Sequence, residues 1–161
     1  MRKTISIMLE LIFITLLSAC SLFSSQDEYL GFSKQDFTVL EEQDTHGGFH
    51  GDGSYYLILD CSDNRETALG IVDTWDELPL SENLELAMYG GEKNGMAYGY
   101  EFSKEAHMPK IQNGYYCFKD RQSEAHDSSD DSQLLSRYSF NFSLGVYDSD
   151  TDTFYYFELD T

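Results

Sequence analysis

The C-terminal end of the chain carries the pattern that most restricts its fold. Over residues 140–147 and again over 154–159, the residues at even positions form one set and those at odd positions form another. This alternation, with a period of two residues, is typical of a strand, whose successive side chains point to opposite faces. Between the two runs, residues 148–152 read Asp-Ser-Asp-Thr-Asp and favour a tight turn. The two runs therefore predict an antiparallel β-hairpin. Its even-numbered positions in the first strand and odd-numbered positions in the second are expected to meet a helix.

Strand-forming residues recur in three other segments. Each segment is short, contains Tyr, Val, Ile, Leu or Phe, and is bounded by turn-forming residues. Together with the hairpin they predict an α+β fold with an antiparallel sheet of about five strands. The three segments are residues 36–43, 54–61 and 111–119.

One main helix is expected after the second predicted strand. Between residues 64 and 75 the apolar positions are three and four apart, and Asp63 precedes them as a capping residue. A second, shorter helix is expected at residues 82–89. Ser81 is its predicted N-cap, and Gly90 is its predicted stop.

The N-terminus has the layout of a secretory signal. A positively charged start is followed by an apolar run, and Leu17-Ser18-Ala19-Cys20 closes it. This tetrapeptide resembles the lipobox of bacterial lipoproteins. The resemblance implies that a signal peptide of residues 1–19 is removed and that Cys20 is lipidated. Its thiol would carry a diacylglyceryl group, and its new amino terminus would carry a palmitate-type acyl group. Residues 20–35 would then tether one domain, residues 36–161, to the outer face of the cell membrane.

The alternatives for this segment are an ordinary signal peptide or an uncleaved N-terminal helix. Glu10 departs from the lipoprotein pattern because it interrupts the apolar run and leaves residues 11–17 as its core. A membrane-spanning helix needs roughly 20 apolar residues, and the sequence contains no such stretch.

The net charge restricts the partners of the protein. The chain has 29 acidic and 10 basic residues, a formal net charge of −19. Such a surface repels the phosphates of nucleic acids, so nucleic acid is not an expected partner, whereas a basic protein or peptide is. The polar stretch 121–133 predicts an exposed loop suited to recognition.

The segment from Asp44 to Gly53 is a candidate metal site. It contains two histidines and two aspartates among four glycines, and imidazole and carboxylate groups are ligands for zinc. His46, His50 and Asp52 are the candidate ligands. The glycines equally fit a structural loop with exposed histidines, and this alternative stays open.

The predicted hairpin turn is a second candidate cation site. Asp148, Asp150 and Asp152 have the spacing of the first ligands of a calcium loop. Thr153 and Leu159 stand where an EF-hand requires glycine and glutamate, so an Asx-type turn is the alternative interpretation.

Two cysteines remain beyond Cys20. Cys61 and Cys117 are candidates for a disulfide if their strands are neighbours and their Cα atoms lie within about 7 Å. The alternative is two free thiols that pack as small hydrophobic groups. Neither cysteine has a histidine nearby in the sequence, and no other nucleophile motif is present. No catalytic residue is therefore predicted.

Three segments give the body of the chain a wider resemblance. It is similar to an uncharacterised group of small proteins from Firmicutes. The resemblance implies an exported bacterial protein and carries no activity. The segments are Gly48 to Gly53, Trp75 to Gly91 with its Leu78-Pro79-Leu80, and Phe140 to Thr161.

Two hypotheses about function follow. The first is a non-enzymatic lipoprotein that binds a basic protein or peptide outside the cell membrane. The second is capture of a cation, zinc or calcium, or a metal-dependent activity, at the loop from His46 to Asp52.

Overall fold

The computed structural model describes residues 29–47, 51–122 and 127–161. The chain divides into two compact units, Met1–Ser33 and Lys34–Thr161, and the second contains all the helices and strands of the described residues. The predicted signal peptide, Cys20 and His50 lie outside the described residues. Within the described ranges, no helix is long and apolar enough to cross a membrane.

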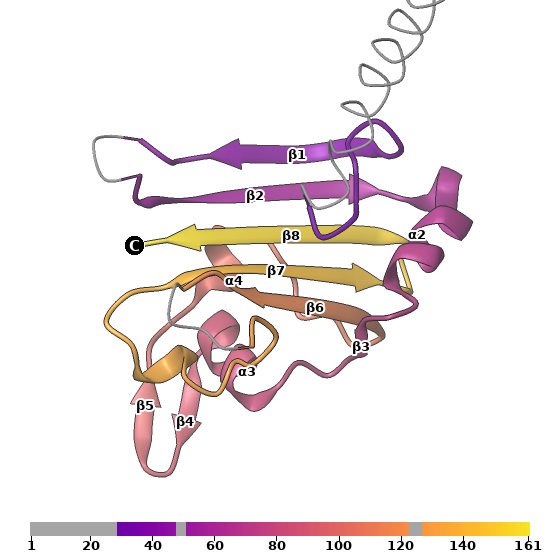
Figure 1. Ribbon diagram of the computed structural model, residues 1–161. Coiled ribbons are helices and arrows are strands. Elements are labelled where there is room, and N and C mark those ends of the chain that lie inside the picture. Colours follow the sequence, from indigo (N-terminus) through magenta and orange to yellow (C-terminus); the bar gives the residue numbers. More distant parts are fainter. Residues whose placement is uncertain (1–28, 48–50, 123–126) are drawn as a thin grey trace, which may run out of the picture. The chain divides into compact units, whose positions relative to one another are not determined.

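Six antiparallel strands form one sheet in the order β1-β2-β8-β7-β6-β3 (Figure 1). The predicted α+β fold with an antiparallel sheet is confirmed. The sheet has one strand more than expected because a two-residue strand adds to one edge. The strands are β1 (Thr38–Asp44), β2 (Gly53–Asp60), β3 (Asp76–Glu77), β6 (Gly114–Asp120), β7 (Asn141–Asp148) and β8 (Thr153–Asp160).

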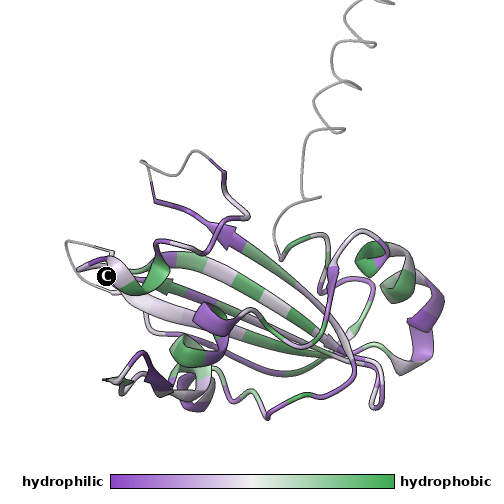
Figure 2. Ribbon diagram, turned by 90° about the horizontal axis from the view of Figure 1, so that it is seen from below, coloured by the Kyte–Doolittle hydropathy of each residue, from purple (hydrophilic) through white to green (hydrophobic). Residues whose placement is uncertain are grey.

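The predicted C-terminal hairpin is confirmed as β7 and β8. The two strands pair from Asn141 opposite Asp160 to Asp148 opposite Thr153, and their residues alternate in hydropathy along each strand (Figure 2). The aspartates build the turn: the Asp150 backbone N–H donates to Asp148 Oδ1 over 2.9 Å, and Asp152 has a positive φ of 52°. Aspartate tolerates this conformation better than most residues.

The predicted main helix after the second strand is also confirmed. It is α2 (Arg65–Val72), which follows a 3₁₀ turn, η2 (Ser62–Asn64). Its N-cap is Asn64 rather than Asp63, because the 3₁₀ turn takes up Asp63 before the helix begins. Trp75 lies beyond the end of this helix, and its ring lies 6.1 Å from that of Phe154.

The second helix, α3 (Glu82–Tyr89), has its predicted boundaries. Ser81 Oγ accepts a hydrogen bond from the Leu84 N–H over 3.2 Å, and Gly90 ends the helix with a φ of 70°. The hairpin face that was expected to meet the helix at 64–75 packs against α3 instead. The core includes Leu84, Ala87, Met88, Phe142, Leu144, Val146, Phe157 and Leu159.

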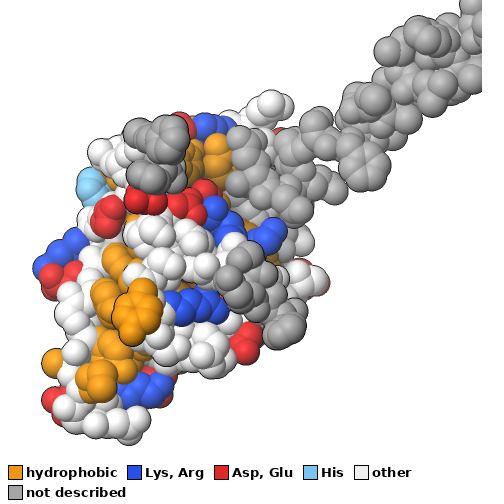
Figure 3. Space-filling model, turned by 60° about the vertical axis from the view of Figure 1, so that its left-hand side comes forward, with side chains coloured by type: hydrophobic (Ala, Val, Ile, Leu, Met, Phe, Trp, Pro, Cys, Tyr) orange, Lys and Arg blue, Asp and Glu red, His pale blue; other side chains and the backbone are white. Residues whose placement is uncertain are grey.

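Short elements occupy the segments that had no clear sequence period. They are the hairpin of β4 (Gly91–Lys93) and β5 (Met96–Tyr98), the helix α4 (Phe102–Glu105) and the 3₁₀ turn η3 (Leu134–Ser136). Some large hydrophobic side chains near them stay exposed, among them Met96 and Tyr138. Hydrophobic side chains gather on one part of the surface, with charged ones around them (Figure 3).

Candidate functional site

His46 is the member of the predicted metal site that lies beside other candidate ligands. It follows β1 and is held by two carboxylates. Its Nδ1 lies 2.7 Å from Asp44 Oδ1, and its Nε2 lies 3.1 Å from Asp160 Oδ2. Asp52 is exposed and does not belong to this group, and His50 lies outside the described residues.

Arg121 extends this contact toward the opposite edge of the sheet. It follows β6, and its guanidinium lies 3.1 Å from Glu158 Oε1 and 3.0 Å from Asp160 Oδ1. Because β8 lies between β2 and β7, these ion pairs cross the end of the sheet from the β1 side to the β6 side. We call Asp44, His46, Asp160, Glu158 and Arg121 the polar chain.

The carboxylates of the polar chain favour the protonated form of His46. Burial lowers the pKa of His46, but its hydrogen bonds with Asp44 and Asp160 outweigh this and raise the pKa above the ordinary 6.5. The backbone N–H and the ring of His46 together lower the pKa of Asp44. Burial and a hydrogen bond to Glu158 raise the pKa of Tyr156 beside them. The imidazole is therefore an ion-pair partner in this structure.

The polar chain contains the one group of described residues that fits a metal ion. Ligand atoms of His46, Glu158 and Asp160 all lie within 4.8 Å of one another. One imidazole and two carboxylates make an acceptable donor set for zinc. A metal bound there would have to displace both the Arg121 guanidinium and the proton that the raised pKa of His46 favours.

Two of these ligands were missed by the sequence prediction. Glu158 belongs to the predicted strand 154–159 and Asp160 directly follows it, whereas β8 includes both. They are two residues apart and so point to the same face of β8. They meet His46 because β2 and β8 pair with Gly53 opposite Asp160. The shared face was visible in the sequence, and the pairing partner was not.

The edge strand β1 is the longest strand of the sheet that is exposed throughout. All seven of its residues are exposed, and a register shift lies between Val39 and Glu41. Glu41 accepts a hydrogen bond from the hydroxyl of Tyr56 over 2.6 Å. Glu42 accepts one from Tyr55 over 2.8 Å. Three carboxylates, those of Glu41, Glu42 and Asp44, therefore line an edge of the sheet.

The hairpin turn does not assemble its aspartates around one point. Asp148 accepts from the hydroxyl of Thr151 over 2.8 Å, and Asp150 accepts from Asn113 over 2.8 Å. Asp152 accepts from the hydroxyl of Tyr147 over 2.7 Å. Because each carboxylate is directed to a separate donor, the geometry is that of an Asx-type turn.

The condition for a disulfide between Cys61 and Cys117 is not met. Both are free cysteines, and the strands in which or after which they lie are not neighbours. Cys61 directly follows β2, Cys117 lies within β6, and β8 and β7 stand between these strands. Burial raises the pKa of Cys61 to about 12 and also raises that of Cys117, so both favour the unreactive thiol.

Comparison with known proteins adds no relative. No family model, no curated protein and no solved structure matches the chain. The resemblances to bacterial lipoproteins and to a group from Firmicutes therefore stay predictions. The chemistry of the described residues is what supports a function.

Proposed function

We propose that this chain is a lipid-anchored, extracytoplasmic binding protein without enzymatic activity, whose acidic sheet edge binds an extended basic segment of a protein or peptide. The observation that carries the proposal is the composition of β1. It is a seven-residue edge strand that is exposed throughout and bears three carboxylates.

An edge strand presents backbone groups that can pair with another strand. Partner proteins use such edges by adding an extended segment, with the backbone giving affinity and the side chains giving selectivity. On β1 the side chains of Glu41, Glu42 and Asp44 repel a second acidic edge, and so disfavour pairing of two copies. The same charges attract a basic segment and speed its encounter with the protein.

The described polar groups support binding rather than catalysis. Both ring nitrogens of His46 are engaged by carboxylates, and burial keeps the thiols of Cys61 and Cys117 protonated. A catalytic nucleophile needs a base within hydrogen-bond reach or a lowered pKa. These groups have the opposite environment.

The anchor follows from the lipobox and is tested separately. In a bacterial host, labelled palmitate should enter the wild-type product, and Cys20→Ser should abolish this incorporation and release the protein from the membrane fraction. If the wild type incorporates no label and fractionates like Cys20→Ser, the protein has no lipid anchor.

The binding edge is tested with a basic peptide of alternating lysine and valine. The full chain in mild detergent is titrated with the peptide, alongside a variant carrying Glu41→Gln, Glu42→Gln and Asp44→Asn. Loss of three exposed ion pairs should weaken binding by about tenfold at low salt. This difference should shrink as salt increases.

A matched variant separates the edge from the overall charge. Asp63→Asn, Glu66→Gln and Asp73→Asn remove three negative charges from exposed positions in or beside η2 and α2. This variant should bind the peptide almost as well as the parent. Equal weakening in both triple variants would show that net charge, and not β1, attracts the peptide.

A second candidate function is the capture of a divalent cation by the polar chain. The convergence of His46, Glu158 and Asp160 favours it, whereas the ion pairs of Arg121 with both carboxylates oppose it. Calorimetric titration with zinc shows whether the three ligands bind the ion or the ion pairs of Arg121 prevent it. Uptake of one equivalent that is lost in His46→Ala would support capture, and equal heats for parent and variant would exclude it.

A further inference from the structure

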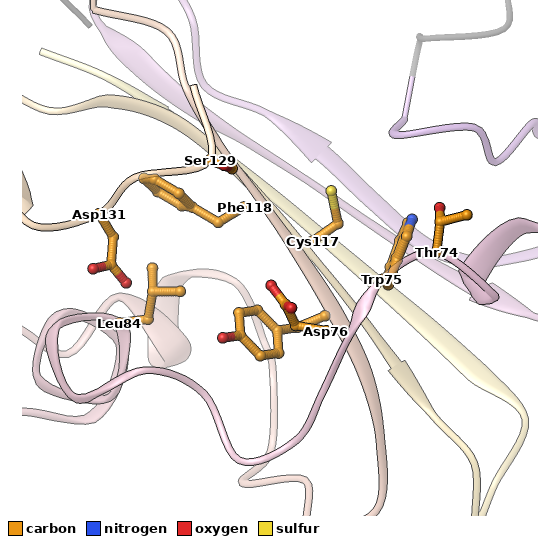
Figure 4. Close-up of a pocket in the computed structure, with 9 residues that line it drawn as sticks. Thr74, Trp75, Asp76, Leu84, Cys117, Phe118, Ser129 and Asp131 are labelled. Carbon is orange, nitrogen blue, oxygen red and sulfur yellow. The ribbon is translucent and has the colours of Figure 1, made fainter. Parts of the chain in front are cut away.

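A pocket opens at the other edge of the sheet, where β3 separates from β6. It has a volume of about 290 Å³, and its walls come from residues 74–76 at the start of β3, from β6, from α3 and from residues 129–131. Trp75 and Cys117 lie on one side of the β6 ribbon, and Phe118, Leu84 and Asp131 lie on the other (Figure 4). The pocket is therefore a gap in the sheet edge, bordered by both faces.

The wall of this pocket combines aromatic rings with acidic groups. Trp75, Tyr116 and Phe118 contribute rings, Asp76 and Asp131 contribute carboxylates, and the lining contains no lysine or arginine. Asp131 is held in place at the start of α3. It accepts hydrogen bonds from the hydroxyl of Ser81 and, over 3.1 Å, from the side chain of Asn83. A cation over aromatic faces and beside carboxylates is stabilised by both.

The backbone of β6 adds polar groups to the pocket. Gly114 accepts a hydrogen bond from Leu78 of the β3 side, and Asp120 donates one to Ser128. In an antiparallel strand every second residue directs its N–H and C=O to the same edge. Phe118, which lies between these contacts, therefore directs its backbone groups toward the gap. Its carbonyl is an acceptor for a donor bound there.

The negative charge of the aspartates raises the pKa of two groups in the wall of the pocket. Burial raises the pKa of Tyr116, and the charges of Asp76 and Asp131 raise it further. Burial likewise raises the pKa of Cys117, and Asp76 adds to the effect, while Lys119 opposes it. The two carboxylates thus act on the same small space.

We propose that this pocket binds an organic cation that carries N–H donors, an alkylammonium or alkylguanidinium head. The volume lies just below the range of about 300–1,000 Å³ usual for drug-sized ligands, so one such head with a short alkyl stem is a suitable occupant. The stem would contact the rings, and the head would donate to Asp76, Asp131 and the Phe118 carbonyl. This inference concerns the edge opposite β1 and does not depend on the proposed function.

The single tryptophan of the chain provides the measurement. Trp75 lines the pocket, so its fluorescence reports on occupancy there without a label. The full chain in mild detergent is titrated with butylguanidinium and butylammonium, and with butanol as a neutral analogue. Saturable changes with both cations and none with butanol are expected. Equal responses to all three would overturn the proposal.

Variants locate the binding. Asp76→Asn removes one carboxylate of the wall, and a lost charge-assisted hydrogen bond should weaken binding at least about tenfold. Asp73→Asn is the matched control because it removes the same charge from an exposed position outside the lining. It should leave the affinity unchanged. Equal weakening by both variants would overturn the pocket as the site.

A third arm identifies the source of the cation. The same titration is made with the blocked tripeptide Gly-Arg-Gly, whose backbone can pair with the groups that Phe118 directs to the pocket. Tighter binding of the tripeptide than of butylguanidinium assigns the pocket to an arginine of a partner, and tighter binding of butylguanidinium assigns it to a small amine. Failure of both to bind would overturn the proposal. The β1 triple variant should respond like the parent in this assay, which separates this test from that of the proposed function.

Discussion

The two edges of the sheet are protected in different ways. β1 is exposed along its whole length, and one of its carboxylates, that of Glu42, forms a 2.7 Å ion pair with Lys34 at the surface. The β6 edge is covered piecewise, by β3 at Tyr115 and Tyr116 and by Ser128 at Asp120.

This difference indicates that the two edges contribute differently to the stability of the fold. Exposed ion pairs contribute little to stability, so the carboxylates of β1 are free to serve recognition and solubility. At the β6 edge, Asp120 is only 4% exposed and forms two hydrogen bonds with Arg137. Its role is to hold the segment before β7 against the sheet.

Removal of the buried ion pair should have the largest effect. Asp120→Asn removes the negative charge that Arg137 bonds, and breaking such a pair should cost about 3 kcal/mol of unfolding free energy, the lower end of the usual range because Arg137 keeps some solvent contact. Chemical denaturation measures this loss. Glu42→Gln on β1 is the control and should cost less than about 1 kcal/mol. Similar losses would mean that the two edges are equivalent.

The cap of α3 should have the next largest effect. Ser81→Ala removes the acceptor for the Leu84 N–H and a donor to Asp131, and loss of an N-cap costs about 1 kcal/mol. Thermal or chemical unfolding measures the cost. Ser132→Ala, an exposed serine that bonds only to Asp130 in its own turn among the described contacts, should change stability much less. If Ser132→Ala lowers stability as much as Ser81→Ala does, the N-cap hydrogen bond of Ser81 does not account for the loss.

The parts of the fold that could be predicted are those set by neighbouring residues. The β7–β8 hairpin follows from a period of two and an aspartate turn, and α3 follows from Ser81, Gly90 and the apolar positions between them. The two-residue β3 and the four-residue α4 have no such local pattern. These two elements depend on packing against residues that are distant in the sequence, so the local sequence period could not predict them.

The candidate site shows the same division. His46 was identified by its chemistry, but its assigned partners were neighbours in the sequence. Asp160 lies 114 residues away and reaches it through the pairing of β2 with β8. Prediction of that contact requires the strand order, which alternation within each strand does not contain.

The pH dependence of stability should have opposite signs at the two edges. The pKa of His46 is raised, so its contribution is complete below the ordinary pKa of 6.5 and is lost as pH rises through the raised value. Burial raises the pKa of Asp120, but the bonds from Arg137 lower it below the ordinary 3.8 overall. Its contribution is complete above that value and is lost as pH falls through the lowered one.

Unfolding curves of His46→Gln and Asp120→Asn across about pH 3 to 9 test these signs. The difference between parent and His46→Gln should shrink toward alkaline pH, and that of Asp120→Asn should shrink toward acid. A His46→Gln difference that grows with pH would mean that the imidazole is neutral in the polar chain.

Salt should produce the smallest change and the sharpest distinction between the edges. At low ionic strength Glu42→Gln should cost about 0.5 kcal/mol, because the pair with Lys34 is exposed. At about 1 M salt the screening length falls to about 3 Å, and this cost should vanish. The cost of Asp120→Asn should persist, since a pair shielded by protein is screened much less. If both costs fell in parallel, solvent ions would reach Asp120, and the β6 edge would be held by surface charge in the same way as β1.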